Sequence, residues 1–363
     1  ANGVYSFYIS ATAIDALATS ASGLFIGSIT NISVIEITDD TNLPRINYEN
    51  GCGSWLFEPQ STNLVTYSED FSQYSTGNSP IIEGGFLAPD GTNNAYKITN
   101  TGSSTLYISG ANFTSAATRS VYARSVSGTG TATLMSYFGN TNNVFTLTED
   151  WQRFEVNGTT AAAGEDNFYA ADFRGSGTLT EYIIWGAQVE EQPYATSYIP
   201  TSGSTVTRNQ DVCTNGGSLA TINSTEGVLY AEIAALANDL TDRDISISDG
   251  TNNNVVRIRL SRFSNNIGYA VLSNGITTVG ALVSGQTQTN TNKIAVKYKQ
   301  DDFALWINGV EVATDTSGST PIGLSSLQFT SGNVALPLFG KTKALAVWKE
   351  ALSDSELQSL TTI

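Results

Sequence analysis

The chain has 363 residues, of which 40% are hydrophobic and only 14% are charged, and its formal net charge is −16. A surface this acidic repels phosphate backbones, which excludes nucleic acid as a partner and disfavours an anionic membrane surface. The sequence contains no histidine, which removes Ser-His-Asp and Cys-His catalysis and the commonest transition-metal ligand. With 33 glycines and 10% aromatic residues, the composition is typical of a turn-rich, extracellular-style all-β protein.

Residues 1–38 consist of short β-rich runs such as VYSFYIS and NISVIEIT. Thirty-eight residues are too few for an independent sandwich. The segment 27–38 also has the layout of 180–191, an aliphatic strand that ends in acidic residues before a connector. We predict that 1–38 are the closing strands of an upstream β-sandwich, in a chain that is the C-terminal piece of a longer or processed protein. A small strand group packed on the next domain is the alternative.

The remainder of the chain predicts two sandwiches separated by connectors. Short alternating runs such as RSVYARSV, separated by Gly, Asn and Ser turns, indicate antiparallel strands. Asn308-Gly309 predicts a tight hairpin, and Ser353 followed by Glu356 predicts the capping box of one short C-terminal helix. The predicted parts are an ordered connector at 39–62, a β-sandwich at 63–200, a second connector at 201–215, and a second β-sandwich at 216–363.

Three stretches carry a family resemblance: WLFEPQSTNLVTYSEDFS at 55–72, APDGTNNAYKIT at 88–99 and YIIWGAQVEEQPYATSYIPTSGSTVTR at 182–208. They resemble the jelly-roll modules of bacteriophage tail fibre and tailspike proteins, which are related to carbohydrate-binding modules. The stretches DFALWINGVEVATD at 302–315 and FGKTKALAVWKEALSDSELQSL at 339–360 resemble concanavalin-like, laminin-G-type lectin domains. The resemblance implies tandem antiparallel sandwiches, without naming a sugar.

Sugar-binding sandwiches stack aromatic rings on pyranose faces and bind the hydroxyl groups with polar side chains. On the strand around 117–125, Tyr122 and Arg124 point opposite to Val121 and Ala123, so they lie on a sheet face that a ligand can reach if Val121 points inward. Tyr182 likewise points opposite to Trp185. For any one of these aromatic residues, a place in the core is the alternative. The candidate carbohydrate-binding residues are Tyr122, Arg124, Tyr137, Tyr182, Trp185 and Trp306.

Trp306 points opposite to the apolar stripe of its own strand, so it lines either a groove or an interface with a neighbouring chain. The only metal that the available ligands suit is calcium, because they are oxygens. Asp242, Asp244 and Asp249 are candidates for a structural calcium ion, with ordinary Asx turns as the alternative. No other cofactor is implied. Cys52 and Cys213 flank the first complete sandwich, and either a Cys52–Cys213 disulfide or two free thiols fits the sequence.

The carboxylates do not suggest an enzyme. Glycoside hydrolysis needs two carboxyl groups facing each other across a sugar, roughly 5–10 Å apart. Glu190 and Glu191 are neighbours on a strand and point to opposite faces, and we expect this pair to be a solvated exit from the sandwich. We therefore predict a protein without catalytic activity.

Together these observations predict a segment of a phage tail fibre or related receptor-binding protein that recognises host surface polysaccharide. The expected location is the virion tail, with other tail proteins as partners and a homo-oligomer, a trimer as in most fibres, as the assembly. No run approaches the roughly 18 apolar residues of a membrane span, so membrane insertion is not expected. The alternatives are a purely structural virion module without a ligand, and a secreted or cell-surface bacterial carbohydrate-binding module.

Overall fold

A computed structural model describes residues 44–49, 52–108, 117–136, 143–159, 167–213 and 216–363. The predicted upstream strands at 1–38 and the candidate Tyr137 lie outside these residues. Internal contacts divide the chain into units of residues 1–40 and 41–363, and every described residue belongs to the second unit. The predicted module boundaries stay predictions.

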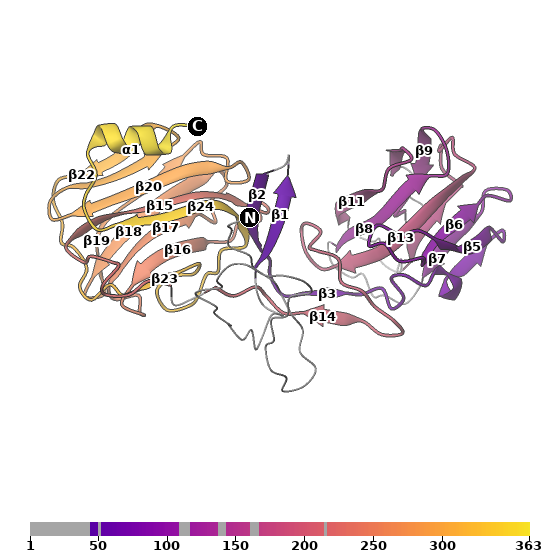
Figure 1. The fold of residues 1–363 in the computed structure, drawn as a ribbon, viewed down its shortest axis with the longest axis horizontal. Helices are drawn as coiled ribbons and strands as arrows, with labels where there is room; N and C mark the ends of the chain where they lie inside the picture. The colour runs from indigo at the N-terminus through magenta and orange to yellow at the C-terminus, as the bar shows by residue number, and fades with distance from the viewer. Residues whose placement is uncertain (1–43, 50–51, 109–116, 137–142, 160–166, 214–215) are drawn as a thin grey trace, which may run out of the picture. The chain divides into compact units, whose positions relative to one another are not determined.

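The first sandwich consists of two five-stranded antiparallel sheets in the described residues, with strand orders β11-β8-β13-β6-β5 and β10-β9-β12-β7-β4 (Figure 1). A 3-10 turn, η1 (Phe71–Gln73), precedes β4. The strands of the first sheet are β5 (Ile81–Phe86), β6 (Ala95–Thr99), β8 (Ala117–Ser125), β11 (Gln152–Thr159) and β13 (Glu181–Glu190). Those of the second are β4 (Ser75–Gly77), β7 (Thr105–Ile108), β9 (Gly130–Thr133), β10 (Val144–Leu147) and β12 (Phe168–Asp172).

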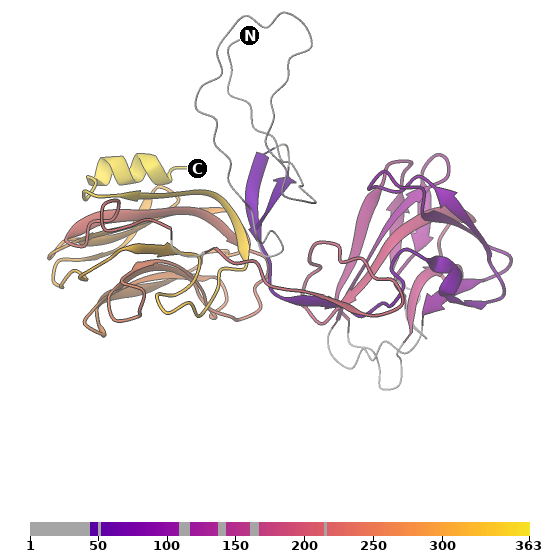
Figure 2. The same ribbon diagram turned by 60° about the horizontal axis from the view of Figure 1, so that its bottom comes forward.

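The second sandwich pairs a seven-stranded sheet, β1-β2-β24-β15-β20-β21-β22, with a five-stranded sheet, β19-β18-β17-β16-β23 (Figure 2). The strands of the larger sheet are β1 (Arg45–Glu49), β2 (Cys52–Phe57), β15 (Glu226–Ala235), β20 (Asn292–Lys299), β21 (Phe303–Ile307), β22 (Val310–Asp315) and β24 (Gly340–Trp348). Those of the smaller sheet are β16 (Arg243–Ser248), β17 (Val255–Leu260), β18 (Asn266–Ser273), β19 (Ile276–Ser284) and β23 (Ser326–Gln328).

Both predicted connectors contain strands. In the first, β1 and β2 form a hairpin, and β2 pairs with β24 through Trp55 and Thr342. Further along, β3 (Ser61–Asn63) pairs with β14 (Val206–Arg208) from the second connector. The segments that flank the first sandwich in sequence therefore meet in a two-stranded ladder.

Alternation of side chains explains where the cores form. In β17, Val256, Ile258 and Leu260 enter the buried cluster of the second sandwich, whereas Arg257 and Arg259 point to the opposite face. In β8, Val121 and Ala123 enter the core of the first sandwich. This alternation buries one face of each sheet against the other sheet of its sandwich and turns the remaining side chains to the outer face.

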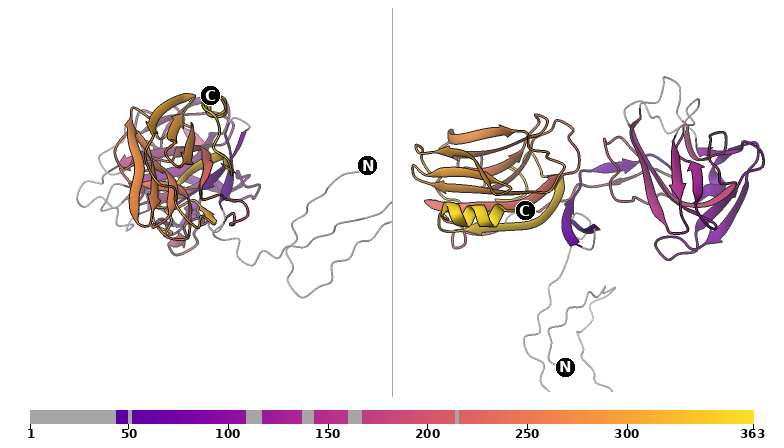
Figure 3. Two further views of the ribbon diagram at one scale, coloured as in Figure 1. Left: turned by 90° about the vertical axis from the view of Figure 1, so that its left-hand side faces the viewer. Right: turned by 90° about the horizontal axis from the view of Figure 1, so that it is seen from above.

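The one α-helix among the described residues, α1 (Asp354–Thr361), lies on the outer face of the seven-stranded sheet (Figure 3). Glu356 accepts hydrogen bonds from the backbone N–H and the hydroxyl of Ser353, so the predicted capping box is present. No helix in the described ranges has the length and apolar character needed to cross a bilayer. The prediction of antiparallel β-sandwiches with one short C-terminal helix is confirmed.

Candidate functional site

An aromatic cluster lies on the outer face of the sheet β11-β8-β13-β6-β5. Tyr122 of β8 lies directly opposite Trp185 of β13, and their ring centroids are 5.4 Å apart in an edge-to-face arrangement. Tyr198, from the segment after β13, joins them with its centroid 4.6 Å from that of Trp185. The predicted residues Tyr122 and Trp185 therefore belong to one face of the sheet.

A bulge in β13 makes room for Tyr198. Gly186 has a φ of 65°, and the strand register shifts between Trp185 and Gln188. A Cβ atom at position 186 would lie 3.1 Å from the Tyr122 ring and 3.3 Å from the Tyr198 ring. Only glycine combines this backbone conformation with such close ring packing.

Two guanidinium groups lie over aromatic rings on this face. The Arg124 guanidinium is 5.4 Å from the centroid of Trp151, and that of Arg153 is 5.6 Å from the centroid of Tyr122. The Arg153 guanidinium already has a partner within the chain, because it donates a hydrogen bond to the Thr196 carbonyl at 2.7 Å. Arg124 donates only to the Ser125 carbonyl, at 3.2 Å, so most of its donors remain available in the described part of the chain.

Exposure separates the buried ring of Trp185 from the half-buried rings of Tyr122, Trp151 and Tyr198. Trp185 is only 4% exposed, and its indole Nε1 donates to the Asn94 side-chain oxygen at 2.8 Å. Tyr122 and Trp151 are half-buried. The Tyr122 hydroxyl has no hydrogen-bond partner among the described residues, so it is free to bind a sugar hydroxyl. We define the aromatic face by Tyr122, Arg124 and Trp151, with the buried ring of Trp185 and the half-buried ring of Tyr198 packed against them.

Tyr182 and Trp306 lie elsewhere. Tyr182 is fully buried in the core of the first sandwich, where burial raises the pKa of its hydroxyl, which donates to the Thr133 carbonyl at 3.4 Å. Trp306 points away from the core of the second sandwich, as its alternation predicts, but it is only 7% exposed and shares a buried cluster with Leu357 of α1. Its ring is covered from within the chain. Tyr137 lies outside the described residues.

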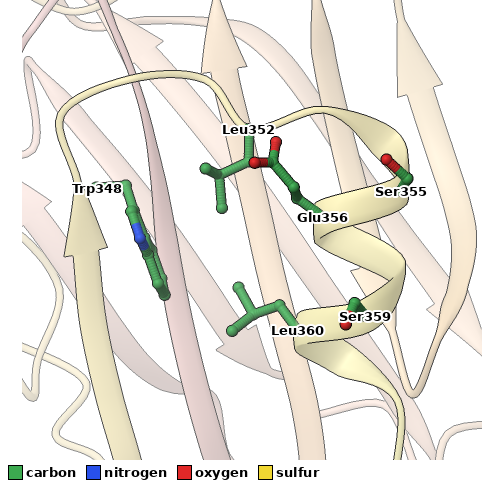
Figure 4. Close-up of a pocket in the computed structure, with 6 residues that line it drawn as sticks. All are labelled: Trp348, Leu352, Ser355, Glu356, Ser359 and Leu360. Atoms are coloured by element: carbon green, nitrogen blue, oxygen red, sulfur yellow. The ribbon is translucent and has the colours of Figure 1, made fainter.

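A shallow pocket of about 420 Å³ borders α1 (Figure 4). In the close-up, the Trp348 ring from the end of β24 faces Leu352 and Leu360 across the space beside the helix. Trp348, Leu352 and Leu360 also pack against the buried cluster that contains Trp306. This hollow is therefore the edge of the packing between helix and sheet.

The three aspartates proposed for calcium have other partners. Asp244 accepts from Arg259 at 2.7 and 2.8 Å, and Asp242 accepts from Arg259 at 3.3 Å. Asp249 accepts from the backbone of Thr251 in an Asx turn. Over the residues that the structure describes, no group of three or more acidic or cysteine side chains could hold a metal ion. The geometry favours the Asx-turn alternative for Asp249 and ion pairing for the other two.

The expectation that Glu190 is solvated is wrong. Its side chain is fully buried and accepts from the Ser61 hydroxyl at 2.6 Å and from the backbone N–H of Thr196 at 2.9 Å. Glu191 is exposed. Glu190 therefore joins β3 to the segment after β13. Alternation could not reveal this, because Ser61 is distant in sequence and Thr196 lies in the loop after the strand.

The thiol of Cys213 is half-buried, and burial raises its pKa. The side chain of Cys52 lies outside the described residues, so the predicted pairing stays a prediction. The arginines of β17 were not among the predicted site residues, although their alternation with apolar residues is visible in the sequence.

No family model matches the chain, and no curated protein matches it. Among solved structures, the CBM40 module of a Ruminococcus gnavus IT-sialidase is 16% identical, with a TM-score of 0.34 over 41% of this chain and 94% of that one. A leech intramolecular trans-sialidase is 19% identical, with a TM-score of 0.33 over 39% of this chain and 24% of its own. The receptor-binding domain of a botulinum neurotoxin C/D mosaic serotype is 11% identical, with a TM-score of 0.28 over 37% and 34%. Similarities at this level do not bear on the ligand of this chain.

Proposed function

We propose that the chain is a non-catalytic glycan-binding segment of a phage tail fibre or a related receptor-binding protein. The observation that carries the glycan-binding proposal is the aromatic face, where the half-buried rings of Tyr122 and Trp151 lie beside the available donors of Arg124. An aromatic ring stacks on the apolar face of a pyranose, while neighbouring donors bind its hydroxyl groups. The tail-fibre part rests on the resemblance of 55–72, 88–99 and 182–208 to jelly-roll modules of such proteins.

The three residues of this face are half-buried, and we propose that a single site binds weakly. Several copies on one particle raise the apparent affinity, because each further binding event becomes intramolecular. We propose that the chain acts as a homo-oligomer, with a trimer as the expected form, on the virion tail beside other tail proteins. Host surface polysaccharide is the proposed ligand.

A glycan array with the full chain tests the proposal. Tyr122→Ala and Trp151→Ala should each weaken binding of a recognised glycan by roughly 2- to 10-fold per site, since a stacked ring contributes roughly 0.5–1.5 kcal/mol. Tyr107→Ala is the matched control, because it removes a half-buried tyrosine from β7 in the other sheet.

Four results would contradict parts of the proposal. If the oligomeric wild type binds no glycan, the structural virion module is correct instead. If Tyr107→Ala and Tyr122→Ala lower the affinity for the glycan equally, the aromatic face is not the binding site. Release of reducing ends from a bound polysaccharide would show an enzyme. Sedimentation of the parent protein as a monomer, detached from particles, would favour the secreted carbohydrate-binding module.

A further inference from the structure

A pocket of about 330 Å³ lies on the outer face of the sheet β19-β18-β17-β16-β23 in the second sandwich. It lies in a different sandwich from the aromatic face and shares no residue with it. Its volume falls in the range of small-ligand sites, roughly 300–1,000 Å³. Arg257 and Arg259 of β17 form one side, because their alternation with Val256, Ile258 and Leu260 turns them away from the core.

Small residues form the floor of this pocket. In the strand register, Arg257 lies opposite Ala270, which lies opposite Gly280, and Arg259 lies opposite Gly268. Opposed residues in an antiparallel sheet point to the same face, so the arginines stand beside a shallow, nearly side-chain-free strip. A Cβ atom at Gly268 would lie 2.7 Å from the Ala281 carbonyl, so a larger residue does not fit there.

The arginines differ in how fully they are paired. The guanidinium of Arg259 donates hydrogen bonds to both carboxylate oxygens of the fully buried Asp244, at 2.7 and 2.8 Å. Arg257 contacts the same carboxylate only at 3.7 Å and makes no hydrogen bond to a described residue. Arg262, at the rim, has no ion pair among the described residues, and its guanidinium lies 5.3 Å from the ring centroid of Phe263.

This pairing leaves a local excess of positive charge. Three arginines line the pocket, whereas the carboxylates that contact them are those of Asp242 and Asp244. The surplus is one positive charge, in a chain whose formal net charge is −16. A cationic pocket in an acidic protein selects an anion by its local field, while the rest of the surface discourages non-specific anion binding.

We propose that this pocket binds the carboxylate of an acidic sugar. The fork of Arg257 matches the two oxygens of a carboxylate, and bidentate pairs of this kind are strong and directional. The ring of the sugar lies over the small-residue floor, and its apolar face contacts Leu282 and Phe263, which are 48% and 53% exposed. Arg262 adds a second cation at the rim.

The test uses the full chain and three ligands matched in ring structure: glucuronic acid, its methyl ester and glucose. Each ligand is titrated at low ionic strength, and binding is measured by calorimetry or NMR. Glucuronic acid should bind, and the affinities of the two uncharged ligands should be at least ~10-fold lower. Two further ligands distinguish the possible sources of the carboxylate. N-acetylneuraminic acid represents a terminal acidic sugar, and an oligo-uronate represents internal uronates of a polymer. Tighter binding of one of them identifies the source.

Variants place the ligand in the pocket. Arg257→Gln and Arg262→Gln should weaken acid binding, the former by ~10- to 100-fold, because hydrogen bonds between charged groups are lost. Ala270→Leu should abolish binding by filling the floor while leaving the arginines in place. The charge-matched control Lys343→Gln, at an exposed position on β24 in the opposite sheet, should bind as the wild type does. Circular dichroism verifies that each variant is folded.

Equal affinity for the acid and its ester would overturn the proposal, as would acid binding that survives Arg257→Gln combined with Arg262→Gln. Inorganic phosphate that binds as tightly as glucuronate would show a general anion site and overturn the sugar assignment. This test is independent of the proposed function, because the Tyr122 and Trp151 variants change the aromatic face and leave this pocket intact.

Discussion

Trp306 offers a direct test of whether a sheet-face tryptophan serves packing or ligand binding. It is 7% exposed and shares a buried cluster with Leu357, which is fully buried in α1. Truncation to alanine removes these contacts and leaves a cavity under the helix, so Trp306→Ala should lower the free energy of unfolding by about 3–5 kcal/mol. The indole Nε1 of Trp306 is buried and finds no hydrogen-bond partner among the described residues.

Trp306→Phe should therefore cost much less than the alanine variant. Phenylalanine keeps an aromatic ring in the cluster and removes the unpaired N–H, which costs roughly 1–3 kcal/mol to bury. Differential scanning calorimetry is the appropriate assay, because a chain with two sandwiches need not unfold in one step. Trp306→Ala should move one transition and leave the other in place, and Trp151→Ala, at a half-buried position in the first sandwich, is the control.

Two results would refute this reasoning. If Trp306→Ala leaves both transitions unchanged, the ring is not packed beneath α1. If Trp306→Ala weakens glycan binding without a loss of stability, Trp306 lines a ligand groove, as the sequence analysis considered.

Three further predictions concern stability. Burial opposes the ionisation of Asp172, but hydrogen bonds from Arg174 and a serine hydroxyl outweigh it and hold the pKa of Asp172 below its ordinary value of 3.8. The stabilising effect of the ionised Asp172 is thus present above pH 3.8 and is lost as pH falls through its lower folded-state pKa. Asp172→Asn should lower the free energy of unfolding by about 1.5–3 kcal/mol at pH 7. Chemical denaturation should show that this difference from the wild type vanishes in strong acid. Glu190→Gln should cost roughly 1–3 kcal/mol in urea titrations, because an amide cannot accept on both sides, and a neutral result would contradict its buried pairing. Ser353→Ala should cost about 1 kcal/mol and increase hydrogen exchange in α1, whereas unchanged exchange would show that the contact with Glu356 does not hold the helix.

Parts of the aromatic face were predictable from local alternation. The side chains around Tyr122 alternate, so its side of the sheet follows once Val121 is placed in the core. Alternation alone did not show that Tyr182 is the buried partner and Trp185 the outer one, because both strand faces carry apolar residues. It also could not show that Tyr198, distant from β8 in sequence, returns to the cluster through the bulge at Gly186.

Long-range register decided the features that the sequence analysis missed. In the sequence, Arg257 and Arg259 are only polar residues on an alternating strand. They line a pocket because small residues of β18 and β19 lie beside them in the sheet. Glu190 is buried because Ser61 reaches it from 129 residues away in the chain. Such pairings depend on which strands become neighbours, which no short window of sequence contains.

The sequence by itself determined the all-β class, the capped terminal helix and the turn-rich division into sandwiches, because these depend on alternation, turn residues and capping over a few positions. The tertiary structure alone decided which rings are exposed, that Trp306 is covered by α1 and Glu190 buried, and that Asp244 pairs with Arg259 but leaves Arg257 without a hydrogen bond. Exposure and charge pairing are properties of residues brought together from distant segments, so they arise only when the sheets have formed.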